Sequence, residues 1–159
     1  MNIRIGFGFD VHPLAAGYPL WLGGIQLESD KGAVGHSDAD VLIHAICDAI
    51  LGAANLRDIG FHFPNTDAKY KGIDSKKLLA ETVTLLHAKN YSIINIDATL
   101  CLEPPKINPH ITAMQNVLAP IMHITADEVS IKATTNERLG FIGREEGVTA
   151  YAVVLISKN

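Results

Sequence analysis

The stretch Ile3-Arg4-Ile5-Gly6-Phe7-Gly8-Phe9-Asp10-Val11-His12 decides how the chain begins to fold. Apolar side chains stand on every second residue from Ile3 to Phe9, which is the period of a strand and places them on one face. Asp10 and His12 are two residues apart, so they point the same way, and Pro13 is expected to stop the strand just beyond them. The stretch therefore predicts a first strand that brings a carboxylate and an imidazole to one place.

Three helices are predicted in the residues that follow this stretch. Ser37 is a good N-cap for a helix over residues 38–54, whose apolar side chains repeat at helical spacing. Ser75 caps a second helix that runs to about Lys89, and Pro109 suits the first turn of a third. Each helix has one apolar stripe, so each is expected to pack one face against a sheet.

The other regular segments are predicted to be strands. Apolar and β-branched runs predict strands over residues 91–102, 129–134 and 148–157, and the double glycine within residues 21–27 indicates a short hairpin pair or a bulged strand. Residues 55–74 are too irregular for an element and rich in turn formers. Long loops in compact domains are usually functional or disordered, and the aromatic anchors of this one favour a functional loop.

Length and composition indicate one globular domain, residues 1–159, with 48% hydrophobic and 19% charged residues. The mixture of elements predicts an α/β fold of the α+β type, in which helices are layered on one face of a mixed sheet. The last strand, residues 148–156, is nearly all apolar, which suggests that both of its faces are buried. A subunit interface and a central strand of a monomer explain this pattern equally well.

Charge, hydropathy and cysteine content limit the expected classes of partner and the expected compartment. The formal net charge is -4 and no cluster of Lys and Arg forms a basic stripe, so neither nucleic acid nor an anionic membrane is an expected partner. No stretch is apolar over the length of a membrane span, and the start alternates like a strand, so a soluble, unexported, cytoplasmic protein is expected. Cys47 and Cys101 lie far apart in apolar contexts, and we expect free thiols in a reducing compartment.

Asp10, His12 and His44 are candidate metal ligands. If the helix that carries His44 packs over the strand end, the three side chains converge and leave a fourth position open, as in catalytic zinc sites. The alternative is a common Asp-x-His tripeptide and a helical histidine that is only a satisfied polar residue. Asp40 and Asp48 flank His44 at four residues on either side, so one of them could orient its second ring nitrogen, or both could be solvated helix charges.

Groups that suit anions occur in three further places. His36 and Ser37 stand at a helix start, where unpaired backbone N–H groups attract phosphate, although an N-cap role explains Ser37 fully. Residues 132–137 end a strand with two hydroxyls, an amide and a carboxylate, which suit phosphate oxygens and Mg²⁺ or form an ordinary polar turn. Pro104-Pro105-Lys106 could frame a base pocket through main-chain groups or be a rigid loop.

Several motifs, in order along nearly the whole chain, carry a resemblance to one family. They are GFGFDVH at 6–12, GHSDAD at 35–40, DIG at 58–60, FPNTD at 63–67, PK at 105–106, KATTNE at 132–137 and LGFIGR at 139–144. Because it has all of these motifs, the chain resembles the 2-C-methyl-D-erythritol 2,4-cyclodiphosphate synthases of the non-mevalonate route to isoprenoids. Phe7, where many relatives carry a polar residue, and Asn136, where others have Thr or Ser, depart from the pattern without removing a ligand.

The resemblance implies a reaction and an assembly. The reaction is the cyclisation of 4-diphosphocytidyl-2-C-methyl-D-erythritol 2-phosphate to 2-C-methyl-D-erythritol 2,4-cyclodiphosphate, with release of CMP. The assembly is a homotrimer in which each active site lies between two neighbouring subunits. Zinc is expected on Asp10, His12 and His44. A second ion, Mg²⁺ or Mn²⁺, is expected between the substrate diphosphate and Glu137, which comes from the adjacent subunit.

The resemblance also assigns substrate contacts. His36 and Thr135 are expected to stabilise the transition state, and the methylerythritol phosphate is expected to be held by Ser37, Asp58, Ile59 and Gly60. The loop expected to close over it consists of Phe63, Pro64, Asn65, Thr66 and Asp67. Cytidine and its phosphate are expected to lie against Leu102, Pro104, Pro105, Lys106, Ile107, Asn108, Ala133 and Thr134. An isoprenoid diphosphate in a central cavity of the trimer would meet Phe9, Phe141 and Arg144.

Two other functions stay open at this point. A zinc-dependent nucleotide-diphosphate hydrolase would use the same three ligands to activate water and would give linear products. A trimeric nucleotide- or isoprenoid-binding protein without catalysis would bind CDP without turnover. Retention of Asp10, His12, His44, Thr135 and Glu137 argues against this last function.

Overall fold

One mixed sheet of five strands runs through the computed structural model, which describes residues 2–159. Its strands are β1 (Ile3–Ala16), β4 (Lys31–Ala33), β5 (Tyr91–Cys101), β6 (Val129–Thr134) and β7 (Gly147–Lys158), in the order β4-β1-β7-β5-β6. The β5–β6 pair is parallel, and the other neighbouring pairs are antiparallel. The strands β2 (Leu20–Leu22) and β3 (Ile25–Leu27) form a separate hairpin, which is the first of the two alternatives predicted for this segment.

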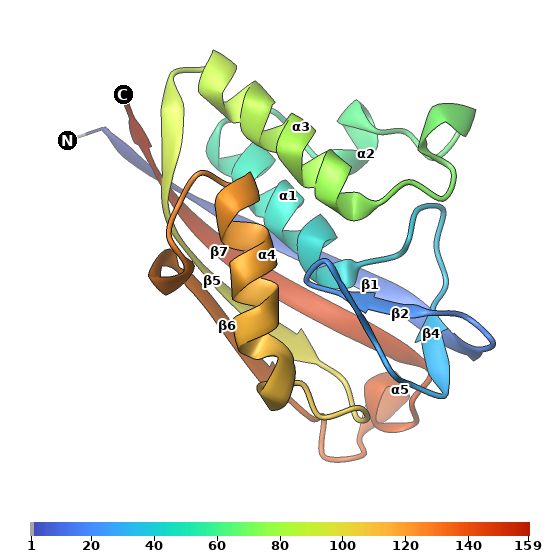
Figure 1. The fold of residues 1–159 in the computed structure, drawn as a ribbon. Coiled ribbons are helices and arrows are strands. Elements are labelled where there is room, and N and C mark those ends of the chain that lie inside the picture. The colour runs from blue at the N-terminus through green and yellow to red at the C-terminus, as the bar shows by residue number, and fades with distance from the viewer. Residues whose placement is uncertain (1) are drawn as a thin grey trace.

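Three helices cover one face of this sheet (Figure 1). They are α1 (Val41–Ala53), α3 (Ser75–Ala88) and α4 (Ile111–Ile121). Shorter helical turns are α2 (Ile59–His62), α5 (Gly140–Gly143), η1 (Ala68–Tyr70), η2 (Asn108–His110) and η3 (Ala126–Glu128). The predicted layer of helices on one face of a mixed sheet is therefore confirmed. Within residues 2–159, none of these helices has the length and apolar character needed to cross a bilayer.

The helix starts differ from those predicted. Asp40, not Ser37, is the N-cap of α1, because Ala39 has a φ of +58° that breaks any helical path from Ser37. The Ser37 hydroxyl instead accepts the Ala39 N–H at 3.1 Å. Asp74, not Ser75, caps α3, and Ser75 becomes its first helical residue.

The segment 55–74 was predicted to lack regular elements, and this prediction is wrong in part. Its carboxylates act as caps, since Asp58 accepts the Phe61 N–H at 3.2 Å and Asp67 accepts the Lys69 N–H at 2.9 Å. These bonds stabilise the short turns α2 and η1 within an otherwise irregular connection.

Pro13 does not end β1, contrary to the prediction. The pairing of β1 with β7 runs from Ile3 opposite Ser157 to Pro13 opposite Gly147. Beyond this point β1 continues to Ala16 by pairing with β4. Proline is tolerated because it stands where the strand changes partner, so its missing N–H interrupts no continuous ladder.

Helix α1 packs directly on β1 because two glycines leave no side chains between them. A Cβ on Gly6 would lie 1.9 Å from the Ala49 carbonyl oxygen, and a Cβ on Gly8 would lie 1.9 Å from that of Ala45. Both distances are far shorter than any real contact. The close approach of strand and helix is what brings His44 over the far end of β1.

The opposite face of the sheet is apolar and exposed. Its large side chains are Ile3, Ile5, Phe7, Phe9, Val11, Tyr151 and Val153. The alternation of β1 therefore puts its apolar residues on one face, as predicted, and this is the face without helices (Figure 1). The expectation that β7 is buried on both faces is wrong within one chain, because Tyr151 and Val153 are 39% and 37% exposed.

Candidate metal centre and adjoining pockets

Asp10 and His12 on β1 and His44 on α1 bring three ligand atoms together, as predicted. Asp10 Oδ2 lies 3.0 Å from both His12 Nε2 and His44 Nδ1, and the two nitrogens are 3.1 Å apart. Two imidazole nitrogens and a carboxylate oxygen are a donor set of zinc sites that keep an open position. Donors bonded to one ion at about 2.0–2.1 Å lie roughly 3.0–3.4 Å from one another, so the spacing fits as well. The three residues therefore fit a metal ion.

The surroundings of Asp10 keep its carboxyl group ionised. Burial alone would raise the pKa of the Asp10 carboxyl, but hydrogen bonds and charge interactions with His12 and His44 outweigh it and lower the pKa below its ordinary value. For His44, burial alone would lower the pKa, yet the Asp10 carboxylate raises it above the ordinary value. An ionised Asp10 thus attracts positive charge, which protonated imidazole or a metal cation supplies.

The second ring nitrogen of His44 is held by hydroxyls and not by Asp40 or Asp48. His44 Nε2 lies 2.9 Å from Ser75 Oγ and 3.1 Å from Ser37 Oγ. Asp40 is fully buried and accepts backbone N–H groups of the β2–β3 turn, while Asp48 accepts the first N–H of α2. Both carboxylates are occupied by backbone donors, which is why the predicted contact with His44 is wrong.

A pocket of about 440 Å³ opens beside the three ligands. The predicted substrate contacts that line it, together with His12 and His44, are His36, Ser37, Ile59, Gly60, Phe63, Pro64, Asn65 and Thr66. Asp58 and Asp67 lie outside this lining because their carboxylates cap α2 and η1. Sequence reasoning missed Tyr70, Ile73 and Leu78, which complete the wall as ordinary apolar residues without a distinguishing pattern.

A second pocket, of about 260 Å³, lies at the ends of β5 and β6. It is lined by Leu102, Glu103, Pro105, Lys106, Ile107, Asn108, Ala133, Thr134 and Thr135. All but Glu103 were predicted to contact substrate. The Glu103 carboxylate accepts the N–H groups of Asn136 and Arg138, both at 3.1 Å, and so shapes the turn that follows β6. In that turn, the Thr135 hydroxyl donates to Glu137 at 3.3 Å.

The two pockets are separate within one chain and share no lining residue. Asp10 pairs with Ala150, Ala150 with Leu100, and Leu100 with Ala133, so three strand spacings lie between them. At about 4.8 Å each, these spacings amount to roughly 14 Å. The structure therefore brings Thr135 and Glu137 to each other but not to the three candidate metal ligands of the same chain.

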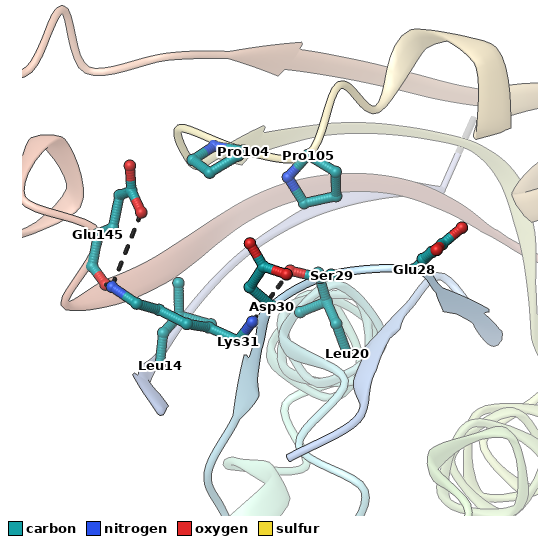
Figure 2. Close-up of a pocket in the computed structure, with 9 residues that line it drawn as sticks. All are labelled: Leu14, Leu20, Glu28, Ser29, Asp30, Lys31, Pro104, Pro105 and Glu145. Carbon is teal, nitrogen blue, oxygen red and sulfur yellow. Dashed lines mark hydrogen bonds and ion pairs between the residues drawn. The ribbon is translucent and has the colours of Figure 1, made fainter. Parts of the chain in front are cut away.

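A third pocket, of about 470 Å³, was not predicted (Figure 2). Pro104 and Pro105 face the segment 28–31 across it, and Lys31 donates to the Glu145 carbonyl oxygen at 3.1 Å. Pro104 lies here instead of in the second pocket. Arg144 lines none of the three pockets and forms an exposed ion pair with Glu146 at 2.9 Å.

Comparison with known proteins agrees with the predicted resemblance. A profile of the YgbB family matches residues 3–157. A relative from Bacteroides fragilis (strain YCH46), named 2-C-methyl-D-erythritol 2,4-cyclodiphosphate synthase, is 65% identical over 158 residues, which are 99% of each chain. A second relative with this name, from Cytophaga hutchinsonii, is also 65% identical over 99% of each chain.

Solved structures extend the similarity to the fold. The bifunctional IspDF of Campylobacter jejuni is similar with a TM-score of 0.95 and 40% identity, over 99% of this chain and 42% of that longer chain. The CDP complex of IspF from Plasmodium falciparum is similar with a TM-score of 0.88 and 31% identity, over 99% of this chain and 97% of that one. The chain therefore belongs to the YgbB family, as the motifs shared with the 2-C-methyl-D-erythritol 2,4-cyclodiphosphate synthases predicted.

Proposed function

We propose that this chain converts 4-diphosphocytidyl-2-C-methyl-D-erythritol 2-phosphate to 2-C-methyl-D-erythritol 2,4-cyclodiphosphate and CMP, in the non-mevalonate pathway to isoprenoid precursors. The observation that carries the proposal is the convergence of Asp10, His12 and His44 beside a pocket lined by residues of the motifs at 35–40, 58–60 and 63–67. The names of full-length relatives at 65% identity support the same reaction. A CDP complex of a related structure supports a cytidine diphosphate as the ligand class.

The reaction needs positioning more than it needs a protein nucleophile. An oxygen of the substrate's 2-phosphate attacks the β-phosphorus, the bond from that phosphorus to CMP breaks, and CMP leaves with the electron pair. The attacking phosphate is already an anion, so we assign no general base. The role of the chain is to hold attacking and leaving groups in line, with His36 on the methylerythritol side and Thr135 on the nucleotide side.

Zinc is the ion that we propose for the three ligands, and Mg²⁺ or Mn²⁺ for Glu137. Imidazole nitrogens suit zinc, whereas the oxygen donors of Glu137 suit a harder cation that also binds phosphate. When bound, the ions would supply charge neutralisation to the diphosphate and polarise its oxygens. The donor set and the 3.0–3.1 Å spacing of Asp10, His12 and His44 support the first assignment.

We propose a homotrimer in which the zinc pocket of one subunit faces the nucleotide pocket of the next. Two observations support it: the two pockets are apart within one chain, and a large apolar sheet face is exposed. An isoprenoid diphosphate on the trimer axis would meet Phe9 on this face and Phe141 and Arg144 near its end. A cytoplasmic location is part of the proposal, and the free thiols of Cys47 and Cys101 support it.

The test is ³¹P NMR of the purified protein with the proposed substrate and Mg²⁺, before and after chelation. Stoichiometric CMP with a cyclic diphosphate, lost on chelation, is the expected result. CMP with a linear diphosphate would identify the zinc-dependent hydrolase instead. Unchanged substrate with measurable binding would identify the binding protein without catalysis.

A further inference from the structure

Ser75 connects the candidate metal ligand His44 to the carboxylate of Asp38, for which no role was predicted. The Ser75 side chain is fully buried, and its Oγ lies 2.9 Å from His44 Nε2. The same hydroxyl donates to Asp38 Oδ1 at 2.5 Å, and the Ser75 backbone N–H donates to Asp38 Oδ2 at 2.8 Å. Asp38 therefore accepts hydrogen bonds from both the backbone N–H and the hydroxyl of Ser75. The Ser75 hydroxyl in turn contacts the His44 ring nitrogen that faces away from Asp10.

The direction of these bonds fixes where the imidazole carries its proton. A hydroxyl has one proton, and the Ser75 proton is given to Asp38, so its oxygen can only accept from His44. His44 Nε2 must then carry an N–H, so in the neutral imidazole the lone pair lies on Nδ1, which faces Asp10 and His12. We propose that Asp38 and Ser75 are positioning residues that hold His44 in the tautomer able to bind a metal through Nδ1. This inference rests on the metal site of the proposed function.

Ser37 also approaches His44 Nε2, but its contacts differ from those of Ser75. Its Oγ is 3.1 Å from the ring nitrogen and accepts the Ala39 N–H, and it lines the pocket. Because Nε2 carries a proton, the Ser37 hydroxyl cannot donate to it and can instead donate its own proton to a phosphate. We therefore assign orientation of the ring to Ser75 and contact with the substrate to Ser37.

Backbone hydrogen bonds also tie the 36–38 turn to the segment that lines the pocket. The Asp38 N–H donates to the Ile73 carbonyl oxygen at 3.1 Å, and the Gly72 N–H donates to the His36 carbonyl oxygen at 2.7 Å. These bonds join the 36–38 turn to the end of the segment that lines the pocket, just before Ser75 begins α3. Removal of Ser75 Oγ would therefore act on His44 while leaving this backbone connection in place.

The test compares Ser75→Ala with Asp74→Ala in the full-length protein. Asp74 caps the same end of α3 by accepting the Lys76 N–H at 2.9 Å, so its loss weakens the helix without removing a His44 contact. Zinc affinity is measured by competition with a chromophoric chelator, and the His44 tautomer by ¹⁵N NMR of the metal-free protein at a pH high enough for the imidazole to be neutral. For Ser75→Ala we expect zinc binding about 10–100-fold weaker and a mixture of tautomers. For Asp74→Ala we expect lower thermal stability with zinc affinity and tautomer unchanged.

Equal loss of zinc affinity in both variants would reduce Ser75 to a structural role and overturn the proposal. An unchanged Nε2–H tautomer in Ser75→Ala would overturn it as well. If the wild-type protein binds no zinc, the proposed metal site fails. The tautomer of the neutral imidazole in the metal-free wild type still tests the role of Ser75, because it must be the Nε2–H form if Ser75 orients the ring.

Discussion

His44 is nearly buried, with a side chain 11% exposed, yet both of its ring nitrogens have polar partners. We expect His44→Ala to abolish zinc binding and activity while the fold is retained, because the apolar stripe of α1 does not include this side chain. Metal analysis of the purified variant, its turnover, and its circular dichroism spectrum check the three parts of this prediction. Full activity of a zinc-free protein would reject the metal assignment.

Cys47 is fully buried in α1, and burial raises the pKa of its thiol to about 12. Since the thiolate is the reactive form, only about one Cys47 in ten thousand is reactive at pH 8 even before access is considered. We expect a Cys101→Ser variant, which reports on Cys47 alone, to resist a thiol reagent in the native state and to react fully in denaturant. Rapid native labelling would show that α1 opens readily.

Individual residues of the site could be predicted where local spacing was enough. Asp10 and His12 are two apart on a strand, so their convergence followed from the period of the strand alone. Ser75 and Asp38 could not be found in this way, because they are 37 residues apart and meet only after α3 has packed beside α1. The competing prediction, a carboxylate four residues from His44, was reasonable locally but ignored the backbone donors that occupy Asp40 and Asp48.

At the scale of elements, the contact of β1 with α1 depends on the absence of side chains. We expect Gly8→Ala to destabilise the protein by about 3 kcal/mol or more, since its Cβ would meet the Ala45 carbonyl oxygen, which cannot rotate away. Gly52→Ala is the matched control, because a Cβ there meets nothing closer than 3.9 Å and alanine favours a helix by about 0.5–1 kcal/mol. Urea unfolding of both variants measures the two changes in stability. Similar unfolding midpoints for Gly8→Ala and Gly52→Ala would contradict the close approach of β1 and α1 at Gly8.

Element boundaries show where local patterns reach their limit. Ser37 was predicted to cap α1, and capping preference alone cannot exclude it, because Ser and Asp are similarly favoured N-caps. The left-handed φ of Ala39 excludes Ser37, but alanine carries no signal for this conformation. Asp40 is chosen because one buried carboxylate serves both the helix and the β2–β3 turn, whose Gly23 and Gly24 N–H groups it accepts.

The whole molecule has one covered and one uncovered sheet face. Alternation in β1 predicted that Ile3, Ile5, Phe7 and Phe9 share a face, but it gave no reason to expect that glycines would face the helices. The apolar β7 likewise pointed to burial on both sides, which one chain does not provide. In both strands the pattern is explained if a second copy of the chain covers the open face, which is the homotrimer that we propose.

The proposal that each active site is shared between two subunits can be tested by mixing two variants. We expect His44→Ala and Glu137→Ala to be inactive alone, because one lacks a proposed zinc ligand and the other the proposed ligand of the second ion. In randomly mixed trimers, a site is intact when its zinc pocket comes from the Glu137→Ala chain and its Glu137 from the His44→Ala chain. About one quarter of the sites then meet this condition, so co-expression with two different tags is expected to restore about a quarter of wild-type turnover.

The matched control mixes His44→Ala with Asp10→Asn, whose changes fall in the same zinc pocket. No arrangement of these two chains gives a site with both ligands, so turnover is expected to stay at background. Because the distance between the two pockets is fixed by three strand spacings of one sheet, a site within one chain would need Glu137 to reach past β7 and β5. If the His44→Ala and Glu137→Ala mixture gave no activity while mass measurements showed mixed trimers, the shared site would be refuted and Glu137 would have to act on its own subunit.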